Sequence, residues 1–281
     1  MSKRNSAEAK RAARERLRAE RERQARRDKI RRQLVVGGSV LAVLALAAGI
    51  GVAVANRDSG GEGDSTDWEA VLAQVTEDAD EGFPTAAPAN TSGENGRTIR
   101  IGPEDAANTV TLYEDPRCPI CAQFEQQVGE AIQQGVDDGD YAVEYVFGTF
   151  LDRAGATGSK NALSALGAAL DVSPEAFLGL HEQLYSEENH PPETLDEYAD
   201  DERLIEIAQS VPELEGNDQF AADVRDSTFA VWALQMSAYF NSAEDVEGTP
   251  AVRFNEDIVD TPRSPADWED MVEANSEQAA E

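Results

Sequence analysis

The 281-residue chain carries 24 Lys and Arg against 55 Asp and Glu, a formal net charge of -31, and 41% hydrophobic residues. The hydrophobic share is enough for one sizeable core, so a globular domain is expected. Residues 1–33 hold 14 basic and 5 acidic side chains, which leaves 10 basic and 50 acidic for the rest. The acidic part argues against binding to nucleic acid or to anionic lipid headgroups.

Residues 34–55, "LVVGGSVLAVLALAAGIGVAVA", contain no charged side chain. A helix of this length rises roughly 33 Å, enough for the hydrocarbon core of a bilayer. Five basic residues lie within 26–32, just before this segment, and only Arg57 lies just after it. By the positive-inside rule, we expect a single transmembrane helix with a basic cytoplasmic segment at 1–33 and an extracytoplasmic remainder.

A cleaved signal peptide is the alternative, because Ala53-Val54-Ala55 resembles a cleavage site. The apolar run exceeds the usual length of a signal peptide's apolar region, so an uncleaved signal anchor is preferred. The basic segment could in principle bind nucleic acid, but beside a membrane span it is more often an orientation signal that contacts lipid headgroups. Whether residues 34–55 are an uncleaved anchor or a cleaved signal peptide, the same domain is exported.

Residues 56–96 are rich in Gly, Ser, Pro and acidic residues and are predicted to be a flexible linker, with a short amphipathic helix within 68–75. The compact domain is expected over 97–281. Its first clear element is a strand at 109–114, which is stopped by Pro116. A helix follows at once, with apolar residues every four positions from Ile120 and a stop at Gly135.

A second strand is predicted at 141–147, so strand, helix and strand form a βαβ unit with a parallel pair. Residues 149–247 read almost wholly as helices, with one continuous helix expected over 218–240. Strands return in "GTPAVRFNEDIVD", and Ser264-Pro265 opens a terminal helix. The fold class is therefore α/β, with a helical insertion between the central strands.

The only two cysteines of the chain, Cys118 and Cys121, lie in "EDPRCPICAQFE" at the predicted strand-to-helix junction. At a helix start, unpaired N–H groups and the positive end of the helix dipole lower the pKa of the first cysteine. Cys118 is then the nucleophile and Cys121 the resolving thiol. Pro119 suits the first turn of the helix, where a missing N–H matters little.

Two other uses of the cysteine pair are weaker. A zinc site needs two more ligands, and the histidines, His181 and His190, do not have ligand spacing. His181 is expected to be packed at the edge of the core and His190 to be a solvated loop residue. A purely structural disulfide over two intervening residues would remove little entropy from the unfolded chain. No metal is therefore expected.

The chain from about 97 to 275 resembles the DsbA-like branch of the thioredoxin superfamily, exported bacterial thiol:disulfide oxidoreductases. The resemblance rests on "LYEDPRCPIC", on the helical insertion and on "VEGTPAVRFN". It implies a thioredoxin-like fold and a redox-active Cys118–Cys121 disulfide without any further cofactor. It also implies a cis proline at Pro250, preceded by Thr249, that faces the disulfide and helps to bind substrate.

Pro119 and Ile120, which lie between the cysteines, are further expected to contact substrate. The most oxidising members of the family carry a histidine at the place of Ile120. We expect Glu114 and Asp115 to be surface carboxylates that oppose thiolate formation, with Arg117 partly offsetting them. A milder oxidant is expected, within the range of about -120 to -270 mV that this chemistry spans.

The sequence therefore predicts an extracytoplasmic thiol:disulfide oxidoreductase that introduces disulfides into exported proteins. It would need a membrane redox partner for its re-oxidation. The alternatives are a disulfide reductase or isomerase that uses the same cysteines, or a non-catalytic thioredoxin-like binding module.

Overall fold

The computed structural model describes residues 66–69, 71–72, 86–93, 96–153 and 155–279. The predicted transmembrane helix at 34–55 and the basic segment at 1–33 lie outside these residues. Among the helices that the structure describes, none combines the length and the apolar character that crossing a bilayer requires.

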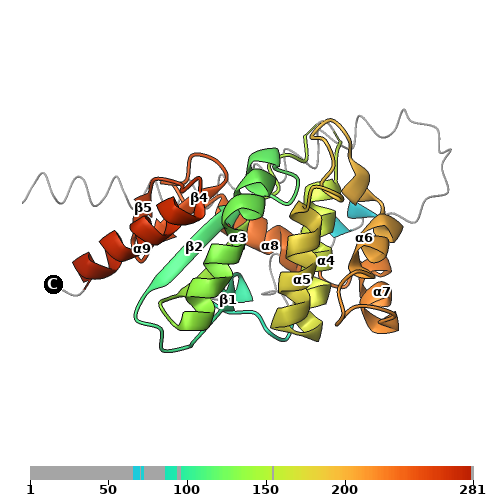
Figure 1. Cartoon of the computed structure of the whole chain (residues 1–281). Helices are drawn as coiled ribbons and strands as arrows, with labels where there is room; N and C mark the ends of the chain where they lie inside the picture. Colours follow the sequence, from blue (N-terminus) through green and yellow to red (C-terminus); the bar gives the residue numbers. More distant parts are fainter. Residues whose placement is uncertain (1–65, 70, 73–85, 94–95, 154, 280–281) are drawn as a thin grey trace, which may run out of the picture. The chain divides into compact units, whose positions relative to one another are not determined.

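Five strands and a set of helices make up the described domain (Figure 1). The strands are β1 (Ile99–Ile101), β2 (Thr109–Glu114), β3 (Ala142–Phe147), β4 (Ala251–Phe254) and β5 (Asp257–Val259). The helices are α3 (Pro119–Asp138), α4 (Gly158–Val172), α5 (Pro174–Tyr185), the short 3-10 helix η3 (Glu197–Ala199), α6 (Asp201–Ala208), α7 (Asp218–Arg225), α8 (Ala230–Phe240) and α9 (Pro265–Ala279).

The strands form one sheet in the order β1-β3-β2-β4-β5. β2 and β3 run parallel, with Thr109 opposite Ala142 and Glu114 opposite Phe147, and α3 connects them. The other neighbouring pairs are antiparallel. The predicted βαβ unit with a parallel pair is therefore confirmed. β1, which was not predicted from the sequence, extends the sheet beyond β3.

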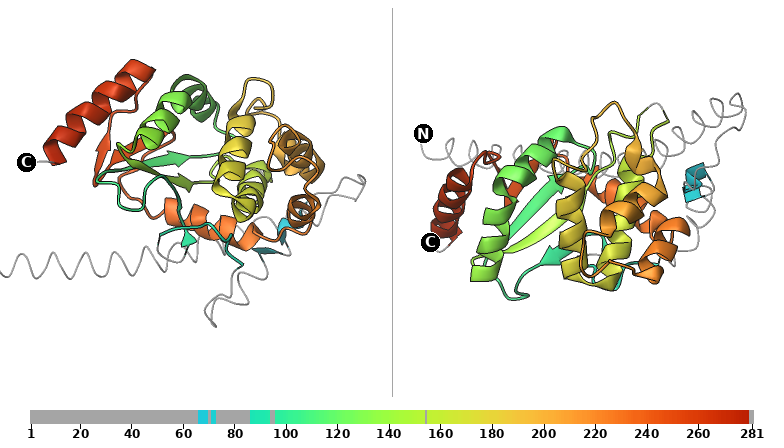
Figure 2. Two further views of the ribbon diagram at one scale, coloured as in Figure 1. Left: turned by 60° about the horizontal axis from the view of Figure 1, so that its bottom comes forward. Right: turned by 45° about the vertical axis from the view of Figure 1, so that its right-hand side comes forward.

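Helices cover both faces of the sheet. Figure 2 shows α3 on one side of the central strands and α8 on the other, while α4 to α7 gather beyond one end of the sheet. β2 is accordingly buried along almost its whole length, as expected for a strand between two layers of helices. The helices α4 to α8 lie between β3 and β4 in the chain and form the helical insertion of the fold.

Helix α3 begins where the sequence predicts but ends later. Gly135 does not stop it, and Gly139, at a φ of 81°, closes the helix in the left-handed conformation that glycine favours. Gly135 instead allows a close approach, because a Cβ there would lie 2.3 Å from Oη of Tyr141. A glycine that permits packing and a glycine that ends a helix look alike in a sequence.

The helix expected over 218–240 is two helices. α7 ends at Arg225 and α8 begins at Ala230. Between them, Ser227 has a φ of 55°, and Thr228 Oγ1 donates to Oδ1 of Asp223 at 2.8 Å. Short polar side chains that bond to nearby groups compete with helical hydrogen bonds, which explains the break.

The expected short helix near Trp68 is described at 68–69 and 71–72, where the residues are helical. Trp68 and Val71 are buried and pack against Ala230 of α8. Thr66, just before them, donates to Oδ1 of Asp201 at 3.2 Å. This segment therefore lies against the helical insertion.

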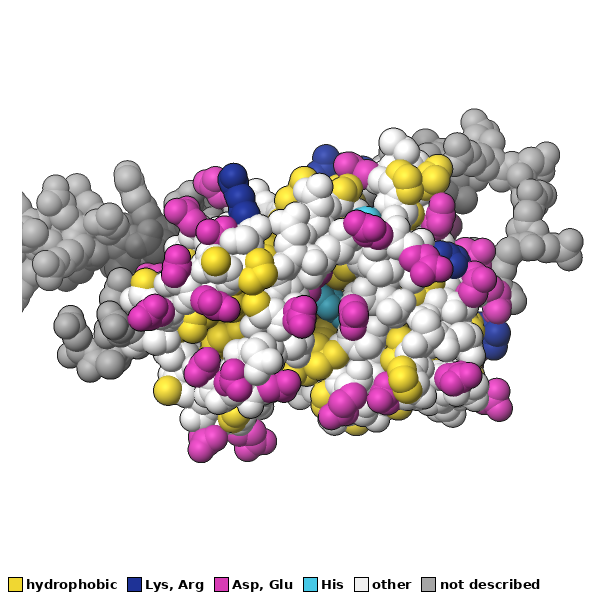
Figure 3. All heavy atoms as spheres, viewed as in Figure 1, with side chains coloured by type: hydrophobic (Ala, Val, Ile, Leu, Met, Phe, Trp, Pro, Cys, Tyr) yellow, Lys and Arg dark blue, Asp and Glu magenta, His cyan; other side chains and the backbone are white. Residues whose placement is uncertain are grey.

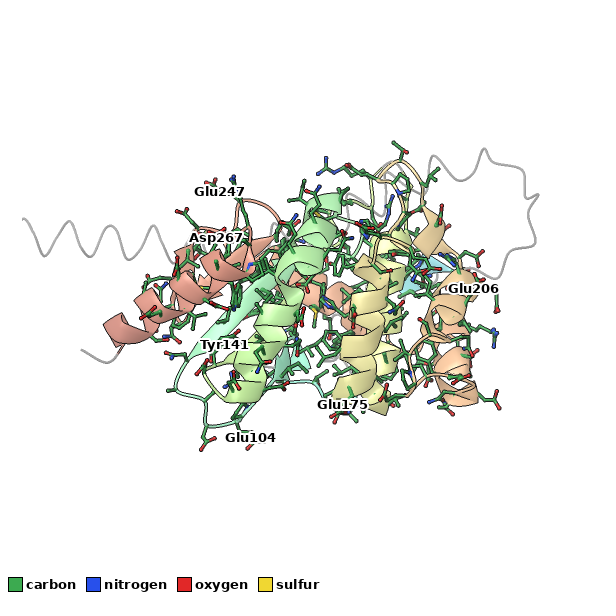
Figure 4. The ribbon with its side chains drawn as sticks, in the orientation of Figure 1. Glu104, Tyr141, Glu175, Glu206, Glu247 and Asp267 are labelled. Carbon is green, nitrogen blue, oxygen red and sulfur yellow. The ribbon has the colours of Figure 1, made fainter. Side chains whose placement is uncertain are left out.

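Acidic side chains spread over the surface of the described domain. Figure 3 shows them scattered over the visible face rather than gathered in one place. The labelled acidic residues of Figure 4 come from well-separated elements and all of them are exposed: Glu104, Glu175, Glu206, Glu247 and Asp267. The acidic excess is thus chiefly solvated surface, although a few carboxylates are buried and matter below.

Candidate active site

Cys118 and Cys121 meet at the start of α3. Cys118 is the N-cap residue and Pro119 the first residue of the helix. Extended backbone angles at Cys118 (φ -75°, ψ 116°) turn its side chain back over the first turn, so Sγ accepts from the backbone N–H of Cys121 at 3.4 Å. Both cysteines are free thiols, with Cys118 6% exposed and Cys121 fully buried.

The surroundings of the two sulfurs separate their pKa values. Hydrogen bonding from the Cys121 thiol lowers the pKa of Cys118 to about 6, assisted by Thr249 and by the N–H groups of Cys121 and Ile120, while burial opposes the shift. Burial raises the pKa of Cys121 strongly, and the thiol of Cys118 and the carboxyl of Glu114 act in the same direction. Cys118 is thus the thiolate at neutral pH, and Cys121 holds its proton.

A distant loop closes over Cys118. The Thr249–Pro250 peptide bond is cis, as the family resemblance implied. When Cys118 is protonated, its thiol donates to the carbonyl oxygen of Thr249 at 3.7 Å. The Thr249 hydroxyl is buried and has no other partner among the described residues, so it is available to donate to a Cys118 thiolate. The structure therefore brings Thr249 and Pro250 to the cysteines across the 131 positions between Cys118 and Thr249.

The residues between the cysteines differ in exposure. Pro119 is partly buried, whereas Ile120 is 58% exposed and is among the most exposed large apolar side chains of the described domain. An apolar side chain that projects next to a nearly buried thiolate offers a contact for an incoming polypeptide. Its side chain cannot donate a hydrogen bond to the sulfur, so only its backbone N–H lowers the pKa of Cys118.

Asp115 was expected at the surface, and that expectation is wrong. Its side chain is fully buried, and Oδ1 accepts from Ser159 Oγ at 2.7 Å and from the backbone N–H of Arg117 at 3.0 Å. Oδ2 accepts from the N–H of Leu151 at 3.1 Å. Burial raises the pKa of Asp115 to about 6, against these hydrogen bonds. Asp115 ties the loop before Cys118 to the helical insertion.

Arg117 also has a role different from the expected one. Its side chain is 3% exposed and points away from the cysteines, with Nη1 at 3.0 Å from Asp196 and 3.4 Å from Asp152. Nη2 donates to the carbonyl oxygens of Glu193 and Leu195, both at 3.1 Å. Because these partners take up its charge, Arg117 fixes the loop and does not act directly on Cys118.

Glu114 is likewise buried rather than at the surface. It is fully inaccessible, and Oε2 lies 2.9 Å from Nε2 of His181 on α5. Burial raises the pKa of Glu114 to about 8 and lowers that of His181, so at neutral pH both groups are chiefly uncharged. The predicted burial of His181 is confirmed. Glu114 is among the groups that raise the pKa of Cys121, and the charge of Cys118 in turn raises the pKa of Glu114.

Other groups near the site were not singled out from the sequence. The carboxyl of Glu125 lies beside that of Glu114, and burial and Glu114 raise its pKa well above the ordinary value. Its position four residues after Cys121 places both on one face of α3, which is the signal that could have found it. Tyr185 donates to the carbonyl oxygen of Asp115 at 3.0 Å. No local pattern marks Tyr185, because the contact joins residues 70 apart in the sequence.

His190, expected to be solvated, is partly buried after α5. Its Nδ1 lies 3.1 Å from the carbonyl oxygen of Leu184, and its ring stacks on Tyr185 with 5.8 Å between centroids. Neither histidine is grouped with the cysteines as a metal-ligand set in the described part of the chain.

The sequence model of the family described as thioredoxin matches residues 94–274. Disulfide bond formation protein D of Bacillus subtilis (strain 168) is 24% identical over 174 residues, covering 62% of this chain and 73% of that protein.

Two solved structures from Mycobacterium tuberculosis are similar as well. The reduced form of a disulfide bond oxidoreductase (DsbG) is 26% identical with a TM-score of 0.54, and covers 66% of this chain and 94% of its own. Oxidised DsbA is 26% identical with a TM-score of 0.53, and the match covers 65% of this chain and 97% of the DsbA chain.

Proposed function

This chain belongs to the thioredoxin family as a DsbA-like thiol-disulfide oxidoreductase, and we propose that it works outside the cytoplasm to introduce disulfide bonds into exported proteins through Cys118 and Cys121. The observation that carries the direction is the low pKa of Cys118, about 6, beside the raised pKa of Cys121. A stabilised Cys118 thiolate favours the reduced enzyme, and an enzyme whose reduced form is stabilised is an oxidant.

The reaction needs only the two cysteines and a substrate dithiol. A substrate thiolate attacks Sγ of Cys118 in the Cys118–Cys121 disulfide, so the bond to Cys121 breaks and Cys121 leaves with the electron pair and takes up a proton. The second substrate thiolate then attacks the substrate sulfur of the mixed disulfide. Cys118 leaves as a thiolate, the substrate is oxidised, and the enzyme is reduced by two electrons.

Substrate would approach over Ile120 and the Thr249–Pro250 loop, because these surround the partly accessible sulfur. Residues 34–55 would anchor the enzyme in the cell membrane with the catalytic domain outside, as their length and flanking charges favour. Each cycle leaves a reduced enzyme, so a membrane redox partner must accept two electrons from it. Residues 56–96 would link the anchor to the catalytic domain at 97–281.

The redox state of the pair in cells tests the direction. Free thiols are trapped by acid quenching and alkylation, and the fraction of oxidised enzyme is read on a gel. A mostly oxidised pair is expected, and a mostly reduced pair would indicate a reductase or isomerase. The Cys121→Ser variant should accumulate mixed disulfides with exported proteins, whereas Cys118→Ser should not. Equal trapping by the two variants would contradict the assignment of Cys118 as the nucleophile.

A further inference from the structure

Three ligand-bearing side chains converge one helical turn from Cys121. Glu114 comes from the end of β2, Glu125 from α3 and His181 from α5. One ligand atom from each lies within 4.8 Å of the other two. The chemistry at Cys118 and Thr249 uses none of these atoms directly, so the cluster calls for a separate explanation.

Two carboxyl oxygens of the cluster have no hydrogen-bond donor when both carboxyl groups are ionised. Glu114 is fully buried, and its Oε1 has no partner among the described residues. Oε1 of Glu125 is also buried and unpartnered. A buried carboxylate oxygen without a donor is rare in folded proteins and costs about 1–3 kcal/mol. The two carboxyl groups are close enough to share a hydrogen bond, which requires a proton on one of them. A metal ion in the place of that proton would contact both groups.

The surroundings favour a cation as that group. The His181 ring packs at 4.9 Å from the ring of Tyr185 and 5.0 Å from that of Tyr145, centroid to centroid, with Phe177 at 5.7 Å. In such an apolar setting two neighbouring carboxylates cannot both carry uncompensated charge. No Lys or Arg is paired with Glu114 or Glu125 among the described ion pairs. Without an ion, burial favours the protonated form of both carboxyl groups. A divalent ion would displace the protons and balance the two charges that then form.

The ligand set selects the kind of ion. Calcium and magnesium prefer six or more oxygen ligands, whereas this cluster offers an imidazole nitrogen and two carboxylate groups. One nitrogen and two oxygen ligands suit zinc, which binds three protein side chains and a water in its open sites. His181 keeps 3% of its surface exposed, and Figure 3 shows histidine atoms at the surface with acidic side chains on either side.

We propose that Glu114, Glu125 and His181 bind one zinc ion in the seam between α3 and α5. The ion is held through Nε2 of His181 and one oxygen from each carboxyl group, and water completes the coordination. This site is separate from the cysteine pair, which was the only place where the sequence suggested zinc. It adds a ligand to the enzyme and changes none of the steps of disulfide exchange.

The test must exclude zinc bound by the cysteines themselves. The purified full chain is therefore oxidised so that both sulfurs are in the disulfide, and its zinc affinity is measured by competition with a chromophoric chelator. One zinc per chain is expected. Glu125→Gln and His181→Phe should each weaken binding by more than about 100-fold, since even the outer-shell partners of a metal typically contribute roughly 10–100-fold.

Glu130→Gln is the matched control, because Glu130 lies on the same helix and is exposed. It should bind zinc as the wild type does. His181→Phe keeps an aromatic ring in the packed cluster, and thermal melting of each variant confirms that it is folded. X-ray absorption at the zinc edge should show nitrogen and oxygen ligands alone. Sulfur in the coordination shell, no zinc binding, or equal affinity of Glu125→Gln and Glu130→Gln would each overturn the proposal. Disulfide exchange, measured separately on metal-free enzyme, reports on the proposed function independently.

Discussion

The backbone N–H of Cys121 donates to Sγ of Cys118 at 3.4 Å, while Cys121 itself is fully buried. The resolving cysteine thus stabilises the thiolate of its neighbour and remains protonated. This relationship makes the pair asymmetric, and the asymmetry determines which sulfur reacts and how readily the disulfide is reduced.

The rate of alkylation of Cys118 should follow its thiolate fraction. Because its pKa is lowered to about 6, the iodoacetamide rate should be half-maximal near pH 6 and nearly constant above pH 8. Cys121→Ala removes the thiol that donates to Sγ, so the midpoint should move toward the value of a free thiol, about 8.5. Peptide mass spectrometry identifies the labelled cysteine. A wild-type midpoint near 8.5 would contradict the proposed stabilisation of the thiolate.

The same shift sets a pH dependence of stability. The folded pKa of Cys118 lies below that of the unfolded thiol, so its thiolate stabilises the reduced protein fully above about pH 8.5. This contribution is lost as the pH falls through about 6. The melting temperature of the reduced protein, relative to that of the oxidised protein, should therefore decline as the pH falls from about 8.5 to about 6.

The hydroxyl of Thr249 should help to hold the Cys118 thiolate. Thr249→Val removes the donor and keeps the shape of the side chain, so the pKa of Cys118 should rise and the enzyme should become less oxidising. Thr249→Ser retains a hydroxyl and is the matched control. A hydrogen bond to a charged group contributes about 1.5–3 kcal/mol, which corresponds to roughly one to two pKa units. Alkylation profiles of the two variants provide the comparison, and identical profiles would exclude this role of the hydroxyl.

Replacing Ile120 should strengthen the oxidant. Ile120→His places an imidazole that can donate toward Sγ of Cys118, so the pKa of Cys118 should fall by about one unit or more. The redox potential, measured by equilibration with glutathione, should become more positive. Ile120→Phe keeps an exposed apolar group without a donor and should leave the potential near that of the wild type. A shift of the same size in both variants would point to packing rather than hydrogen bonding.

Asp115→Asn should destabilise the domain. Asp115 accepts from Ser159, from Arg117 and from Leu151, and an amide nitrogen in place of one oxygen would face a donor. An unsatisfied buried group costs about 1–3 kcal/mol, so the free energy of unfolding should fall by that amount in urea titrations. Asp137→Asn, at an exposed position of α3, should change it little. Equal effects of the two substitutions would show that the buried contacts contribute nothing.

The parts of the fold that the sequence predicts correctly are those determined by residues close together in the chain. The strand at 109–114 and the helix after Pro119 follow from local patterns. Capping is local as well: Ser173 caps α5, where its Oγ accepts from the N–H of Ala176 at 3.0 Å. The cysteine pair was recognisable because its spacing and its place at a helix start are both local. Only the family resemblance predicted that Thr249 lies close to the cysteines.

Burial of the carboxylates could not be predicted in this way. Glu114 ends a strand and Asp115 lies between it and a proline, where side chains are often exposed. Nothing in the sequence shows that α5, whose His181 lies 67 positions after Glu114, covers this carboxyl group. The acidic composition also favours a surface position for Glu114 and Asp115, because most carboxylates of so acidic a chain are expected to face solvent. Only tertiary packing distinguishes these few acids from the many that face solvent.

Ile120 is 58% exposed, whereas Cys118, two residues before it, is only 6% exposed. The same side chain therefore meets arriving polypeptides and determines which groups surround the reactive sulfur. A substitution here that adds a hydrogen-bond donor therefore changes both the surface that a client contacts and the strength of the oxidant. One apolar residue in place of another changes the client contact alone, so at this position client selection can vary among related enzymes while the driving force stays constant.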